Sequence, residues 1–215
     1  MTITHHPSDT TLAAFAGGQL DPGSSAVVSS HLASCQTCQR WVATLENLGG
    51  VLLADLPATP MVPGSLTDTM GRLNVPLESD EPARAFTAAE DAAWLPEALR
   101  PYKLGPWRWL APGVYQRKVD VPSGDGSRVF LLKAAPGTRL PVHIHTGVER
   151  TQVLAGAFTH DGGRFGAGDF DDAEGDVEHR PSIDPGEECI CLVAMTGDIK
   201  MTGPIGRVIQ PLLRL

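Results

Sequence analysis

The chain has 215 residues, a length that suggests one or two domains. Its formal net charge of −8 argues against DNA or an anionic membrane as the main partner, because phosphate contacts need clustered lysines and arginines. No segment approaches the ~20 apolar residues of a membrane span, and the N-terminus lacks the basic start of a signal peptide. Four cysteines in two tight pairs suit a reducing compartment. We therefore expect a cytoplasmic protein with no direct nucleic-acid or membrane contacts.

Residues 1–75 predict a small helical module. Capping residues and glycines mark four helices: residues 9–16 behind Ser8, residues 24 or 25 to about 35 behind the turn Asp21-Pro22-Gly23, residues 36–48 stopped by Gly49-Gly50, and residues 65–74 behind the capping box Ser65-Leu-Thr-Asp68. Helices of this size bury little apolar surface alone. A bound metal is therefore a plausible source of the missing stability.

The second and third of these helices meet at the stretch His31-Leu-Ala-Ser-Cys35-Gln-Thr-Cys38. Two thiolates three residues apart, with an imidazole four residues ahead of the first, provide three ligands of a tetrahedral Zn²⁺ site. The fourth ligand is His5 or His6, since these are the nearby histidines. The alternatives are a chance Cys-x-x-Cys or a redox pair, but a redox pair would follow a buried strand, and none precedes Cys35.

This histidine and cysteine pattern resembles the zinc-binding anti-sigma domain. The resemblance implies that His6 is the fourth ligand and that the module holds an extracytoplasmic-function sigma factor inactive by wrapping helices around it. The isolated fourth helix, which follows the proline-rich connector at residues 56–64, fits an element that reaches across such a partner. The simpler alternative is that this helix packs on the first three.

The second part of the chain predicts an all-β fold. Residues 76–86 are charged and contain prolines, which is typical of an interdomain linker. A short helix is expected from Thr87 to Trp94. After Pro101, short runs of β-branched and aromatic residues alternate with turn residues, which indicates one sandwich or barrel. The predicted domains are therefore residues 1–75 and 87–215.

A second group of metal ligands lies in this β-region. His143 and His145 are two apart in an expected strand and so share a face, and Glu149 arrives on the next strand. The spacing Gly-x5-His-x-His-x3-Glu-x6-Gly, followed by Gly168 and His179 at Gly-x10-His, resembles the two cupin motifs. Glu174 and Asp176 depart from it, standing where a Pro and a Gly are usual. The four ligands predict a second divalent metal, Zn²⁺ first, with Fe, Mn or Ni also suited; the alternative is a metal-free barrel.

Cys189 and Cys191 lie two apart on a late strand, a separation that does not readily permit a disulfide. They are either small core residues or oxidation-sensitive thiols near the metal. His160 belongs to neither ligand group and is expected to be a solvated or strand-surface residue.

Taken together, a zinc anti-sigma module, a linker and a cupin with Cys-x-Cys near its end resemble the ChrR anti-sigma factors over almost the whole chain. The fold class is therefore two-domain α + β, with a zinc-bound helical domain before a cupin barrel. The resemblance implies a 1:1 complex with an extracytoplasmic-function sigma factor, released under oxidative stress such as singlet oxygen through the cupin. The competing hypothesis is a cupin dioxygenase with an accessory zinc module.

Overall fold

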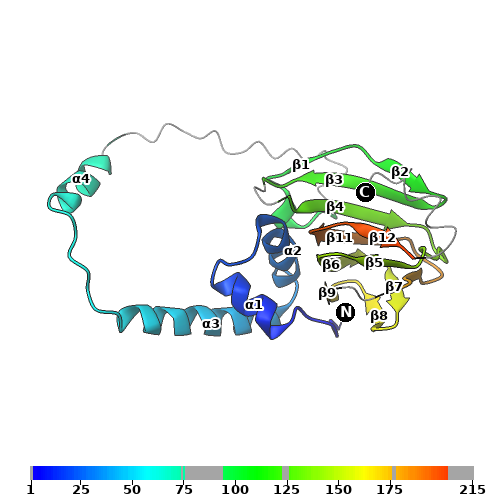
Figure 1. Ribbon diagram of the computed structural model, residues 1–215, viewed down its shortest axis with the longest axis horizontal. Coiled ribbons are helices and arrows are strands. Elements are labelled where there is room, and N and C mark those ends of the chain that lie inside the picture. The colour runs from blue at the N-terminus through cyan, green and yellow to red at the C-terminus, as the bar shows by residue number, and fades with distance from the viewer. Residues whose placement is uncertain (1, 74, 76–93, 123–125, 176–177, 203–215) are drawn as a thin grey trace.

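The computed structural model describes residues 2–73, 75, 94–122, 126–175 and 178–202 (Figure 1). The predicted linker at residues 76–86 lies outside the described residues, and so does the helix expected from Thr87, apart from Trp94. Among the described helices, none combines the length and apolar character needed to cross a membrane.

The first two helices show how local capping sets helix boundaries. Helix α1 (Asp9–Ala16) begins as predicted, with the Ser8 hydroxyl accepting a hydrogen bond from the Thr11 N–H. Helix α2 (Pro22–Leu32) begins earlier than predicted, so the expected turn at residues 21–23 is wrong. The Asp21 carboxylate caps the helix by accepting from the Ser24 N–H at 2.9 Å. Proline suits the first helical position because its fixed φ is helical and its missing N–H needs no partner there.

The predicted end of the third helix at residue 48 is wrong, because helix α3 (Gln36–Ala54) continues through Gly49 and Gly50. Glycine costs about 1 kcal/mol in a helix but does not forbid one, and helix-forming residues flank this pair. Helix α4 (Ser65–Arg72) forms as expected, but the predicted capping box is wrong. Gly64, with φ of 91°, precedes the helix, and the Ser65 hydroxyl donates backwards to the Val62 carbonyl.

A 3-10 helix, η1 (Glu97–Leu99), leads into the β-region. The main sheet has seven strands in the order β1-β3-β4-β11-β6-β9, with β2 paired to β3; these strands are β1 (Lys103–Leu104), β2 (Arg108–Ala111), β3 (Val114–Asp120), β4 (Arg128–Ala134), β6 (Val148–Ala155), β9 (Phe170–Glu174) and β11 (Cys189–Met195). Two small sheets complete the fold: β10-β7-β8, from β7 (Ala157–His160), β8 (Gly163–Gly166) and β10 (Ser182–Ile183), and β12-β5, from β5 (His143–His145) and β12 (Ile199–Met201).

Side-chain alternation gives the main sheet two buried faces. In β11, Cys191 and Val193 belong to a core shared with the small sheets, whereas Leu192 and Ala194 belong to a core shared with the helices. Successive side chains of a strand point to opposite faces, so one strand serves both cores. The helix-facing core also contains Val27 and Val28 of α2, both fully buried. The first helices and the β-region are thus packed as one body.

Most of α3 and all of α4 lie outside this packed body. In α3 the buried residues are Cys38 and Val42, both in its first two turns, and no residue of α4 is buried. Figure 1 shows α3 projecting from the β-region and α4 lying well beyond it. Among the described elements α4 has no substantial packing partner and none of its residues is buried, so the alternative that it packs on the first three helices is not what the structure shows.

Two candidate metal sites

The first cluster joins the N-terminal segment to the junction of α2 and α3. Its members are His6, His31, Cys35 and Cys38, whose ligand atoms all lie within 4.8 Å of one another. His6 Nδ1 is 3.4 Å from the Sγ of both cysteines. The structure places His5 outside the cluster, with its ring 4.2 Å from that of Phe165. Of the two histidines that the sequence left open, His6 is therefore the one beside the thiols.

Hydrogen bonding leaves one nitrogen of His31 available for a metal. Its Nδ1–H donates to the Gly168 carbonyl at 3.0 Å, so Nε2 carries the lone pair in the neutral ring. That Nε2 is buried and has no hydrogen-bond partner among the described residues. Burial lowers the pKa of His31 to about 4, so the ring is neutral near pH 7. An unpartnered imidazole nitrogen beside two thiols fits a Zn²⁺ ion.

Cys38 of this cluster is a thiol in the metal-free protein. Burial raises the pKa of Cys38 to about 12, and the hydrogen bond and charge of Cys35 add to this effect. A bound cation reverses that balance, because it stabilises the thiolate directly. The donor set thus favours a tightly held structural metal over a freely reactive thiol pair.

The second cluster lies inside the β-region and contains His143, His145 and His179. His143 and His145 are on β5, and His179 joins them through an antiparallel bridge with His143. His179 Nε2 is 2.9 Å from His143 Nε2 and 3.2 Å from His145 Nε2. Glu149 of β6 lies beside this group, with its Oε2 3.1 Å from His145 Nε2, but only the three histidines form the compact cluster. The structure thus brings three of the four predicted ligands together and places the fourth next to one of them.

Protonation in this cluster also suits a metal. The His143 Nδ1–H donates to the Pro141 carbonyl at 2.8 Å, which leaves Nε2 as the lone-pair nitrogen facing its neighbours. Burial lowers the pKa of His143 and of His145, and it lowers the pKa of His179 to about 4. Burial also raises the pKa of Glu149 to about 7. Neutral rings with converging nitrogens are the ligands that a divalent transition metal requires.

A cavity of about 520 Å³ opens onto this second cluster. Its walls are largely apolar, and His143, Glu149, His179 and Cys191 are among the residues that line it. A ligand in this cavity would contact apolar side chains and lie next to the histidine cluster. That geometry is typical of a small-molecule site, where a few polar groups converge in an apolar pocket.

Asp171 is a cavity residue that the sequence did not predict, and His160 is more buried than expected. Asp171 of β9 lines the same cavity, and its Oδ2 lies 2.9 Å from His160 Nε2. The side chain of His160 is only 10 % exposed, so the expected solvated position is wrong. Its ring centroid is 5.5 Å from that of His179. No local sequence signal places Asp171 in the cavity or pairs it with His160.

Cys189 and Cys191 lie side by side, with their Sγ atoms 3.6 Å apart, and both are buried. The register of β11 against β6 shifts between Ile190 and Cys191. The hydrogen bond with Cys189 and burial raise the pKa of Cys191, which disfavours the reactive thiolate. Both residues belong to the core on the cavity side, as one of the two sequence interpretations expected.

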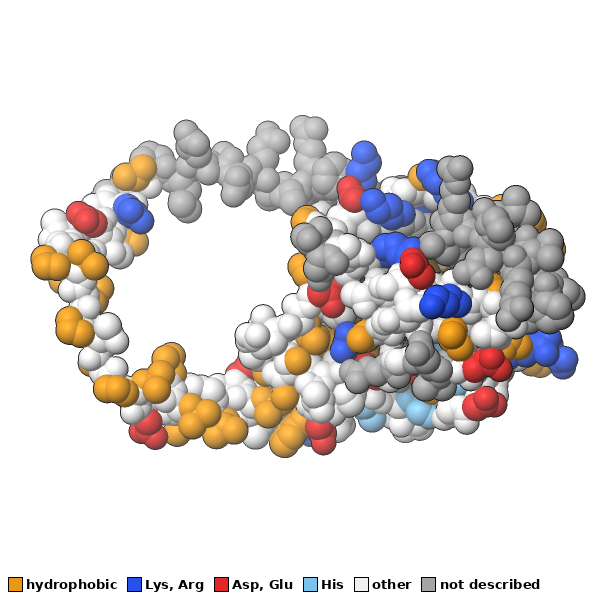
Figure 2. Space-filling view, in the orientation of Figure 1, with side chains coloured by type: hydrophobic (Ala, Val, Ile, Leu, Met, Phe, Trp, Pro, Cys, Tyr) orange, Lys and Arg blue, Asp and Glu red, His pale blue; other side chains and the backbone are white. Residues whose placement is uncertain are grey.

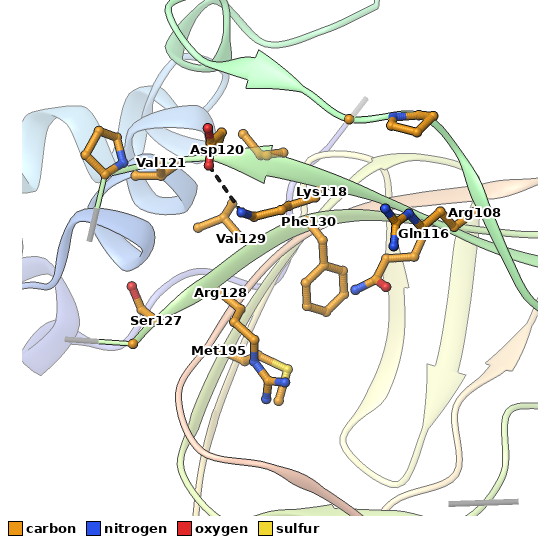
Figure 3. Close-up of a pocket in the computed structure, with 15 residues that line it drawn as sticks. Arg108, Gln116, Lys118, Asp120, Val121, Ser127, Arg128, Val129, Phe130 and Met195 are labelled. Carbon is orange, nitrogen blue, oxygen red and sulfur yellow. Dashed lines mark hydrogen bonds and ion pairs between the residues drawn. The ribbon is translucent and has the colours of Figure 1, made fainter. Parts of the chain in front are cut away.

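A second cavity, of about 710 Å³, is lined by residues of β2, β3, β4 and the end of β11 (Figure 3). Its described lining contains no histidine or cysteine, and its charged groups include Arg108, Arg128 and the ion pair between Lys118 and Asp120. It therefore contains none of the predicted ligands.

Comparison with known proteins places the chain in a family. Residues 97–197 match the model of the ChrR cupin-like domain. The anti-sigma-E factor ChrR of Cereibacter sphaeroides is 34% identical over 215 residues, which are 100% of both chains. The chain belongs to the ChrR family of anti-sigma factors. This assignment favours the anti-sigma interpretation over the dioxygenase, and it confirms the predicted helical region followed by a cupin.

A solved structure agrees with this family. The chain resembles a chain in the crystal structure of Rhodobacter sphaeroides SigE in complex with the anti-sigma ChrR, with a TM-score of 0.72 and 36% sequence identity. The match covers 91% of this chain and 100% of that one. The likeness therefore extends over both the helical region and the cupin.

Proposed function

We propose that this protein is an anti-sigma factor that binds an extracytoplasmic-function sigma factor in a 1:1 complex through residues 1–75. The observation that carries the proposal is the unburied apolar surface of the second half of α3, the connector and α4, here called the apolar arm (residues 46–73). Its large apolar side chains are 54–76 % exposed: Leu48, Val51, Leu52, Leu53, Leu56, Met61, Val62, Leu66, Met70 and Leu73.

Such a surface is unusual for a chain without a partner. Figure 2 shows hydrophobic side chains along α3 and around α4, away from the β-region. Contiguous apolar patches of this extent mark protein interaction sites, because water contact with them is unfavourable. An arm that projects from a packed body can also lie along a partner on more than one side. The sigma factor bound by the relative supports the identity of that partner.

The first metal site would anchor this arm. We assign Zn²⁺ to His6, His31, Cys35 and Cys38, because thiolate and imidazole donors at this spacing select it. When bound, zinc contributes folding free energy by linking the N-terminal segment to the junction of α2 and α3. The buried side chains of Cys38 and Val42 hold the first two turns of α3 against the packed body, and the arm extends from there.

The cupin would carry the response to a signal. We assign a second divalent metal to His143, His145, Glu149 and His179, Zn²⁺ first, with Fe, Mn or Ni as alternatives. Support comes from the converging Nε2 atoms and the cavity that reaches them. An oxidative signal acting there would shift the protein toward a form that binds the sigma factor less tightly. The parts of the chain before and after residues 76–86 would then differ in role without being separate folding units, since α2 and the β-region share a core.

The test is binding of the purified full-length protein to a panel of extracytoplasmic-function sigma factors that includes SigE. At least one member should bind with 1:1 stoichiometry. Leu53→Asp and Leu66→Asp place a charge on the arm and should each weaken binding by tenfold or more. Trp109→Asp is the matched control, since Trp109 is 63 % exposed on the cupin strand β2. If no member binds, or if all three variants bind alike, the proposal is wrong.

A further inference from the structure

The turn between β8 and β9 in the cupin touches the N-terminal zinc cluster directly. The Gly168 carbonyl of this turn accepts the hydrogen bond from His31 Nδ1–H at 3.0 Å. In metal sites, such a partner fixes which ring nitrogen carries the proton and holds the ring in its orientation. The Phe170 ring, fully buried, contacts the same imidazole with centroids 5.5 Å apart. A cupin turn therefore sets both the tautomer and the tilt of His31.

Asp169, the residue between them, holds the other side of the cluster. Its Oδ1 accepts the backbone N–H groups of Thr4 at 2.6 Å and of His5 at 3.0 Å. The Phe170 N–H donates to the His5 carbonyl at 3.1 Å. Three backbone groups next to His6 are thus tied to the cupin, and these fix where His6 enters the cluster.

The surroundings of Asp169 stabilise its charged carboxylate. Its Oδ2 also accepts the Gly166 N–H at 2.8 Å within the turn. Burial alone would raise its pKa, but the N–H groups of Thr4, His5 and Gly166 outweigh that effect and lower it. The side chain is 6 % exposed, so its carboxylate is held by these donors and largely shielded from water.

We propose that the turn at residues 166–170 is the outer shell of the N-terminal zinc site, with Asp169 as its positioning residue. This inference rests on the zinc assignment proposed above. It means that zinc affinity depends on the cupin fold. By thermodynamic reciprocity, zinc in turn stabilises the turn that leads into β9, the strand of Asp171 in the cupin cavity. Residues 166–170 thereby connect the N-terminal cluster to Asp171, which lines the cavity of the second cluster.

The test is zinc affinity of the full-length protein, measured by competition with a chromogenic chelator. Asp169→Ala should weaken zinc binding by about 10- to 100-fold, the usual effect of removing an outer-shell partner. Asp169→Asn keeps one acceptor oxygen, so its zinc affinity should lie between those of the wild type and Asp169→Ala. Asp161→Ala, an exposed aspartate in the neighbouring β7–β8 turn, is the matched control and should bind like the wild type. The metal content of the cupin cluster should stay unchanged in all three variants.

A second measurement needs no variant. Removing zinc from the wild type should speed hydrogen exchange at the amides of Gly166 and Phe170, while amides of β3 and β4 stay protected. Zinc affinities within twofold of the wild type for both Asp169 variants, or unchanged exchange at these amides, would overturn the inference alone. A wild type that binds no zinc at all would overturn the proposed zinc site and this inference with it.

Discussion

Arg150 of β6 and Asp172 of β9 form an ion pair beneath the first two helices. Arg150 Nε lies 3.4 Å from Asp172 Oδ1, and the two side chains are only 8 % and 9 % exposed. Arg150 also donates to the Ser24 hydroxyl of α2 at 2.9 Å, and Asp172 Oδ2 accepts from the Thr11 hydroxyl of α1 at 2.6 Å. The pair thus joins the main sheet to both helices.

Breaking this pair should destabilise the whole body. Arg150→Met leaves the Asp172 carboxylate buried without its cation, and removing one partner of a buried pair costs about 3–5 kcal/mol. Urea denaturation of the zinc-loaded protein measures the change in unfolding free energy. Lys118→Met is the control, because its pair with Asp120 is 75 % and 63 % exposed and such pairs contribute ~1 kcal/mol at most. Equal losses for both variants would contradict the role of Arg150.

The proposed zinc ligands lead to a second prediction. His6→Ala, His31→Ala, Cys35→Ser and Cys38→Ser should each lower zinc content sharply and loosen the start of α3, because each removes one of four donors. His5→Ala should keep zinc, since its side chain lies outside the cluster and its backbone bond to Asp169 survives. Metal analysis of each purified variant checks this. A His5 variant without zinc beside a zinc-loaded His6 variant would reverse the assignment.

Thiol reactivity should separate the two cysteine pairs. In the metal-loaded protein all four cysteines are buried and should alkylate slowly with iodoacetamide at pH 8. The thiolate is the nucleophile, so the raised pKa of Cys191 lowers its reactivity at any pH below that pKa. A zinc chelator removes the folding free energy that zinc contributes at the junction of α2 and α3, so this junction should loosen and expose Cys35 and Cys38 while Cys189 and Cys191 stay protected. Peptide mass spectrometry reads each site, and fast labelling of Cys191 in the intact protein would speak for the oxidation-sensitive interpretation.

The glycine pair in α3 makes a prediction about the arm. No described atom lies within 4 Å of a Cβ built on Gly49 or Gly50, so alanine fits without a clash. Gly49→Ala and Gly50→Ala should each stabilise this part of the helix by up to about 1 kcal/mol. Hydrogen exchange at residues 48–54 should slow by up to about fivefold. Gly156→Ala is a contrasting control, since its φ is 67° and a Cβ would meet the Glu188 carbonyl oxygen. Faster exchange in the α3 variants would contradict this account.

Local chemistry allowed much of this structure to be predicted from the sequence. The Ser8 cap, the His31 and Cys35 spacing and the alternation of His143 with His145 depend on neighbours within a few residues. The errors have two causes: the cost of glycine in a helix, and contacts between residues far apart in the sequence. Helix α3 passes Gly49 because a helix tolerates the cost of glycine when its flanks favour it. His160 pairs with Asp171, and no local pattern connects these two residues. The contacts of Asp169 with Thr4 and His5 join residues more than 160 positions apart in the sequence.

The exposed arm also has a consequence for the lifetime of the protein in a cell. Proteases and chaperones recognise unpacked apolar segments, and the residues from Leu48 to Leu73 present one continuously while the packed body does not. In the proposed complex the sigma factor would cover this segment, whereas in an unbound copy the segment would stay accessible to proteases. Degradation would then remove the surplus, and the cellular amount of this chain would follow the amount of its partner without any control of synthesis.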